Sequence, residues 1–171
     1  MKDFIKLARD RYSVRSFSDK KIGQDKVDLI LKAAQVAPTA RNFQPQRLLV
    51  LQSQEALEKW RRCTVCHFNE QLVILVCYNS EESSKRSYDG QDSGFIDGSI
   101  IMTHMMMESW DLGIGSTWVM NFDPEAVRRE FALEPNLVPV SALTMGYAAD
   151  DACPNPRHSQ RKPLEETVKV L

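Results

Sequence analysis

Two arginines and a serine within five residues are the groups of this chain best suited to bind an anion. Arg11, Ser13 and Arg15 alternate along a segment that directly follows a short amphipathic stretch. The forked guanidinium donors of arginine match the oxygens of a phosphate, and the serine hydroxyl adds a neutral donor. A basic pair after a helix is also a common solvated surface, so the segment alone leaves both interpretations open.

A second polar segment lies between Pro38 and Pro45 and brings two carboxamides together, those of Asn42 and Gln44. A carboxamide both donates and accepts hydrogen bonds, which suits the edge of a heterocyclic ring such as a pyrimidine. The alternative is a turn-forming asparagine beside a solvated glutamine.

A third segment repeats the chemistry of the first one near the end of the chain, where two adjacent cations, Arg161 and Lys162, precede Pro163. None of the three histidines occupies a position that we can match to catalysis, so we expect no catalytic residue among the side chains. Those histidines are His67, His104 and His158.

The four cysteines are too few and too scattered for a disulfide scaffold. Cys63 and Cys66 have a spacing that can bind a metal or perform dithiol chemistry. A structural zinc site needs four ligands, and no second Cys/His pair is placed to complete one, so we expect no metal site. Free thiols and a redox-active pair both remain open.

Periodicity and caps predict the elements that must position these groups. Strands that alternate with helices predict an α+β layered domain. The expected helices cover 3–11, 25–37, 54–62, 95–112 and 123–131, and the expected strands cover 47–51, 72–78, 114–120 and 137–147.

Two polar segments fall outside these elements. The polar composition of residues 79–94 predicts a mobile connection. Residues 150–171 form a long polar arm that has too few apolar residues to build a core of its own. The arm and an apolar helix at 95–112 suggest a domain that completes itself by dimerisation, and we expect residues 1–171 to form one such domain.

Composition narrows the class of protein. The chain has 171 residues, 43% hydrophobic and 26% charged, with a net charge of −1, which argues against a general nucleic-acid binder. No apolar run is long enough to cross a bilayer, and the first residues do not resemble a signal peptide, so we expect no membrane partner and a cytoplasmic location.

Taken together, the segments resemble the FMN-dependent nitroreductase family over nearly the whole chain. Any one motif is common, but the set in this order and at these spacings is specific. The matching motifs are RYSVRSF at 11–17, APTARNFQP at 37–45, LGIGSTW at 112–118, NFD at 121–123, GYA at 146–148 and RKP at 161–163.

The resemblance implies a three-layer fold, with a central, mostly antiparallel sheet flanked by helices, in an interwoven homodimer with an extended C-terminal arm. It also implies two FMN sites at the subunit interface. Arg11, Tyr12, Ser13 and Arg15 would hold the phosphate and ribityl chain, joined by Arg161 and Lys162. Further contacts would come from the neighbouring subunit, through Pro38, Thr39, Ala40 and Asn42.

Met120 and Asn121 would lie against the flavin ring and present a backbone N–H near its N5. The family often has glycine in this turn, so Asn121 puts that contact in question. No dinucleotide-binding glycine motif is present, so NADH or NADPH would bind only transiently.

The implied activity is that of an oxidoreductase. Hydride would pass from NAD(P)H through flavin N5 to a nitroaromatic, a quinone or a similar electron-poor acceptor by a ping-pong mechanism. Two alternatives stay open: other flavin chemistry on the same scaffold, such as dehydrogenation, dehalogenation or flavin breakdown, and a non-catalytic flavin-binding dimeric module.

Overall fold

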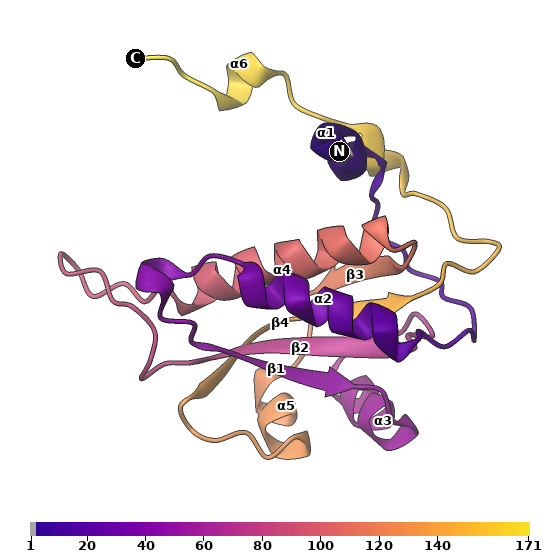
Figure 1. The fold of residues 1–171 in the computed structure, drawn as a ribbon, viewed down its shortest axis with the longest axis horizontal. Helices are drawn as coiled ribbons and strands as arrows, with labels where there is room; N and C mark the ends of the chain where they lie inside the picture. The colour runs from indigo at the N-terminus through magenta and orange to yellow at the C-terminus, as the bar shows by residue number, and fades with distance from the viewer. Residues whose placement is uncertain (1–2) are drawn as a thin grey trace.

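The computed structural model describes residues 3–171, in which helices cover both faces of a four-stranded antiparallel sheet (Figure 1). The sheet order is β1-β2-β4-β3, which confirms the predicted α+β layered fold. The strands are β1 (Gln46–Leu51), β2 (Leu72–Asn79), β3 (Gly115–Val119) and β4 (Leu137–Gly146). The helices are α1 (Phe4–Asp10), α2 (Gln24–Val36), α3 (Gln54–Cys63), α4 (Gly94–Asp111), α5 (Pro124–Glu130) and α6 (Leu164–Thr167), with short 3-10 helices η1 (Ala40–Asn42) and η2 (Pro156–Ser159).

The continuous apolar run of β2 is explained by its place in the middle of three layers. Helices α2 and α4 cover one face of the sheet, and α3 and α5 cover the other (Figure 1). Every residue of β2 is buried. Leu72, Ile74 and Val76 pack with α2 and α4, whereas the alternate residues Val73 and Leu75 pack with α3 and α5. A strand covered on both faces has no polar face, because successive side chains point to opposite sides.

Caps set the helix ends within one or two residues of the predicted ones. The Asp3 carboxylate accepts hydrogen bonds from the N–H groups of Ile5 and Lys6 and so starts α1 at Phe4. At the end of α4, Gly113 adopts φ +75°, a left-handed conformation that glycine takes without strain.

The connection between β2 and α4 folds back on itself through an antiparallel bridge between Lys85 and Asp92. At its tip the Tyr88 side chain is 96% exposed. Its mobility stays a prediction.

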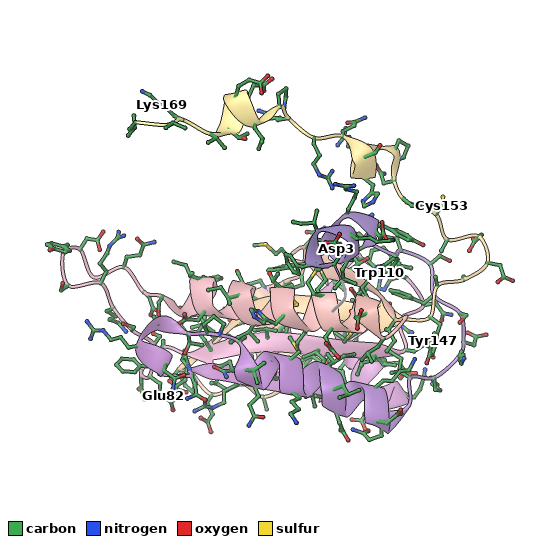
Figure 2. The ribbon with its side chains drawn as sticks, turned by 45° about the horizontal axis from the view of Figure 1, so that its top comes forward. Asp3, Glu82, Trp110, Tyr147, Cys153 and Lys169 are labelled. Atoms are coloured by element: carbon green, nitrogen blue, oxygen red, sulfur yellow. The ribbon has the colours of Figure 1, made fainter. Side chains whose placement is uncertain are left out.

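The C-terminal arm, residues 150–171, lies outside the three layers of helices and sheet. No residue of 150–171 is buried, although η2 and α6 form within it. Figure 2 shows the arm starting near Cys153, passing α1 near Asp3 and then running out to Lys169. Within residues 3–171, no helix is both long enough and apolar enough to cross a membrane.

Candidate functional site

The segment expected to bind an anion, residues 11–17, lies along the edge of the sheet, beside β3. Ser13 forms a parallel bridge with Ser116, and the Val14 N–H donates to the Ser116 carbonyl at 3.1 Å. The Thr117 hydroxyl donates in turn to the Val14 carbonyl. Two residues of β3 therefore fix the backbone of the segment, while its arginine side chains remain outside the sheet.

Two glycines create the space in which this segment sits. A Cβ atom on Gly115 would lie 2.7 Å from Val14 Cγ2, and one on Gly146 would lie 2.8 Å from Phe17 Cβ and Cγ. Real Cβ atoms do not approach carbon atoms this closely, so any larger residue would push the segment away from the sheet. Gly115 of the LGIGSTW motif and Gly146 of the GYA motif thus allow residues 11–17 to lie close to the sheet.

Arg11 and Arg161 come close together in space, although 150 residues separate them in the sequence. Burial lowers the pKa of the Arg11 guanidinium, and the positive charge of Arg161 lowers it further. Arg161 donates to the backbone carbonyls of His158 and Gln160. In the described chain, neither guanidinium pairs with a carboxylate. Two neighbouring cations, one of them half-buried, are unfavourable unless an anion joins them.

The other predicted members of this cluster lie around the same place. The Tyr12 ring packs edge-on against Trp110 at 5.3 Å between centroids and against His158 at 6.2 Å. The Arg15 guanidinium donates to the Ser13 carbonyl at 3.3 Å, and Lys162 is exposed. A pocket of about 400 Å³ opens beside the cluster, lined by Ile5, Ala8, Arg9, His158, Ser159 and Arg161.

The polar loop after Pro38 has an unusual backbone. Three of its non-glycine residues have positive φ angles: Arg41 at 55°, Asn42 at 57° and Gln44 at 52°. Such conformations cost about 1–3 kcal/mol each in residues with a Cβ and persist where the surroundings or a function enforce them. The Gln44 N–H donates to the Thr39 hydroxyl at 3.1 Å, which closes the loop from within.

A buried carboxylate anchors this loop. Asp97 in the first turns of α4 is only 2% exposed, and it accepts hydrogen bonds from the Ala40 N–H at 2.9 Å and from the Ser93 hydroxyl at 2.8 Å. Sequence reasoning overlooked Asp97. The available signal was a single carboxylate within the apolar stretch Phe95 to Met102.

Within one chain, the loop and the arginine cluster do not meet. The loop contacts α4 at Asp97, while Tyr12 contacts the same helix at Trp110. At about 1.5 Å per residue, these two positions on α4 are about 20 Å apart. Glu82, on the segment after β2, and Trp110 label the two separated ends of the molecule in Figure 2. The structure thus brings Arg11, Tyr12, Ser13, Arg15 and Arg161 together and leaves Pro38, Thr39, Ala40 and Asn42 apart from them.

Between these two ends, α1, α2 and α4 border a large apolar groove of about 620 Å³. Phe4 and Val36 are among its lining residues, with 64% and 69% of their surface exposed. Large apolar patches on a protein surface typically mark an interaction site.

Met120 and Asn121 follow directly on β3, the strand that lies beside residues 11–17. From Ser116 to Met120 the chain advances about 13 Å at about 3.3 Å per residue. Met120 is 68% exposed. The Asn121 N–H donates to no atom of residues 3–171, and the φ angle of Asn121 is not among the positive ones. Asparagine in the place of the glycine therefore needs no strained backbone, and its N–H is free for a ligand.

The cysteines are free thiols. Burial raises the pKa of Cys63 to about 11 and that of Cys77 to about 12, so both stay protonated near neutral pH. Over the part of the chain that the structure covers, no three His, Cys, Asp or Glu side chains gather as a metal site would require.

Comparison with known proteins gives a consistent result. The model of the nitroreductase family matches residues 8–68 and 58–147. An Archaeoglobus fulgidus protein, whose name combines NADH dehydrogenase and NAD(P)H nitroreductase, is 31% identical over 160 residues, or 88% of each chain.

Two solved structures are also similar. A nitroreductase family protein from Clostridium difficile 630 is 38% identical, with a TM-score of 0.92 and 98% of each chain covered. A nitroreductase-type protein from Exiguobacterium sibiricum, crystallised in complex with FMN, has a TM-score of 0.85 over 100% of this chain and 98% of its own. At 21% identity, that second likeness is one of fold.

Proposed function

This chain belongs to the nitroreductase family, and on that premise we propose that it is an FMN-dependent NAD(P)H oxidoreductase acting on small electron-poor molecules. The family match supports the class of reaction, and the name of the Archaeoglobus relative supports NAD(P)H as the donor. The Exiguobacterium protein of the same fold is a complex with FMN.

The proposal rests mainly on the half-buried Arg11 guanidinium beside Arg161, since neither guanidinium forms an ion pair with a carboxylate of the described residues. FMN fits this arrangement because its phosphate brings close to two negative charges. Charge-assisted bonds to forked guanidinium donors are about twice as strong as neutral ones. Arg11, Ser13 and Arg15 hold the phosphate and ribityl chain, and Arg161 and Lys162 approach from the arm.

The ring end of the cofactor belongs at Met120 and Asn121. These residues lie about 13 Å along β3 from the phosphate-binding segment, and the free Asn121 N–H supplies a donor for a ring nitrogen. When bound, FMN supplies hydride chemistry at N5, accepting from NAD(P)H and passing to the acceptor in a ping-pong sequence. The residues of the chain bind and orient the cofactor and provide no acid or base of their own.

A complete site needs a second copy of the chain. Antiparallel pairing of two α4 helices would place the Asp97 end of one copy beside the Trp110 end of the other. Pro38, Thr39, Ala40 and Asn42 would then reach the arginine cluster of the partner, and the apolar groove would be covered. The exposed arm would wrap the partner, and residues 1–171 would act as one domain in a cytoplasmic homodimer.

The purified protein tests the cofactor directly. We expect it to be yellow, or to quench FMN fluorescence and gain thermal stability when FMN is added. Anaerobic NADH or NADPH should bleach the flavin within seconds, and initial rates with a quinone should give parallel double-reciprocal lines. A protein that shows neither FMN quenching nor thermal stabilisation contradicts the proposal, and bound flavin that resists both donors favours the non-catalytic module.

Sedimentation tests the dimer separately. Ending the chain after Asp150 removes the arm together with Arg161 and Lys162. We expect this variant to dissociate at concentrations where the full chain is dimeric and to lose FMN. A full-length protein that sediments as a monomer with bound FMN would contradict the shared site.

A further inference from the structure

The turn at Met120 and Asn121 is held by a distant part of the chain, the last residues of α3 and Thr64 directly after it. The Asp123 N–H donates to the Cys63 carbonyl at 2.8 Å, and Thr64 forms an isolated antiparallel bridge with Phe122. The Trp60 ring packs against Phe122 at 5.7 Å between centroids. Residues 60–64 thus support the turn from the side of α3.

The Thr64 side chain forms hydrogen bonds on both sides of this junction. The Thr64 hydroxyl donates to the Asn121 carbonyl at 2.5 Å and accepts the Cys66 N–H at 3.1 Å. Thr64 is only 8% exposed, so water competes little for these bonds. The hydroxyl thus donates one hydrogen bond and accepts another, which together fix its orientation.

The Thr64 bond fixes the direction of the Asn121 N–H through two successive peptide planes. The Asn121 carbonyl and the Phe122 N–H belong to one planar peptide unit, whose tilt the Thr64 bond sets. The Phe122 N–H then donates to the Met120 carbonyl at 3.0 Å. That carbonyl shares its own peptide plane with the Asn121 N–H, so fixing the carbonyl also fixes the direction of the N–H.

We propose that Thr64 is the positioning residue that aims the Asn121 N–H at the flavin ring. Thr64 does not touch the cofactor and acts only through the two peptide planes of the turn. The assignment rests on the proposed FMN site. It also gives this chain a means of holding an asparagine-containing turn in one orientation.

The test is replacement of the hydroxyl by a group of the same shape. Thr64→Val removes the donor while it keeps the β-branched side chain. We expect FMN to bind about three- to tenfold more weakly, the loss of one aligned hydrogen bond, and the visible absorption bands of bound FMN to change shape. Thr64→Ser retains the hydroxyl and should restore both the affinity and the spectrum.

Thr144→Val is the matched control, because the Thr144 hydroxyl is also buried and donates to a backbone carbonyl, that of Thr117, at 3.2 Å. We expect it to lower the melting temperature of the protein without FMN while leaving the FMN dissociation constant and spectrum unchanged. If Thr64→Val does not fold, Thr64→Ala removes the same donor with a smaller side chain.

Two results overturn the assignment while wild-type protein binds FMN. One is an unchanged dissociation constant and spectrum in Thr64→Val. The other is an equal loss of FMN affinity in Thr144→Val, which would mean that general destabilisation explains the effect. Wild-type protein that does not bind FMN at all overturns the proposed function itself, and the inference with it.

Discussion

Removal of the Arg11 guanidinium should weaken FMN binding strongly while it leaves the stability of the protein without FMN almost unchanged. In most half-buried positions, truncation to alanine lowers both, because contacts of the side chain are lost. Arg11 differs because burial and Arg161 already disfavour its charge in the protein without ligand. Arg11→Ala removes the unfavourable buried charge, which raises the stability of the protein without FMN, and it also removes the packing of the side-chain stem, which lowers that stability. These two changes oppose each other.

The magnitude follows from the bonds that Arg11 would make. A hydrogen bond to a charged group contributes about 1.5–3 kcal/mol, which corresponds to about 10- to 150-fold in the dissociation constant of FMN. For the protein without FMN, we expect the melting temperature to change by less than about 2 °C. Arg41→Ala is the matched control, since Arg41 is exposed and lies in the Pro38 loop. It should change FMN affinity by less than about threefold.

Fluorescence quenching of FMN, titrated at low and at 0.5 M salt, measures both variants against wild type. Because salt screens charge interactions, wild-type affinity should fall with salt more steeply than that of Arg11→Ala. Equal losses for Arg11→Ala and Arg41→Ala would refute the assignment of the phosphate. An Arg11→Ala protein that melts much earlier but binds FMN normally would show that Arg11 has a structural role.

Three further changes test other parts of the site. Gly146→Ala should lower the free energy of unfolding by about 1–3 kcal/mol and weaken FMN binding, because the new Cβ meets Phe17 and displaces residues 11–17. Calorimetry measures the first effect and FMN titration the second; an unchanged melting temperature and an unchanged FMN affinity would contradict the close contact. Asp97→Ala should weaken FMN binding and lower the melting temperature by leaving the Ala40 N–H unpaired, whereas Asp97→Asn should do so less; equal behaviour of the two variants would argue against this anchor. Burial raises the pKa of Cys63 from 9.0 to about 11, so between these pH values the folded state keeps a proton that the unfolded state has lost, and stability should fall as pH rises from about 9 to 11. Cys63→Ala should make the melting temperature depend less steeply on pH in this range. An unchanged slope would contradict the shift.

Local signals in the sequence were sufficient for much of the fold. The all-apolar run of β2 requires cover on both faces, and the structure supplies it from α2, α4, α3 and α5. The end of α4 at Gly113 was equally predictable, because a left-handed residue after a helix favours glycine. Such features depend on neighbours in the sequence, so periodicity and caps reveal them.

The contacts that hold the candidate site together could not be predicted in this way. Asp97 reaches the N–H of Ala40, 57 residues away, and Thr64 reaches Asn121 across the same separation in sequence. A lone buried carboxylate or hydroxyl has no periodicity, and its partner is a backbone group that every residue possesses. Only the packing of α3 and α4 against the sheet brings these pairs within bonding distance.

The sequence by itself determined the chemistry of the opening segment: forked cations and a hydroxyl on residues 11–15, typical of phosphate binding. The tertiary structure decided which other groups join it. It placed Arg161 of the arm beside Arg11 and left the Pro38 loop at the other end of α4. The physical reason is that side-chain type is local, whereas the surroundings of a charge depend on how the sheet and helices bring distant segments together.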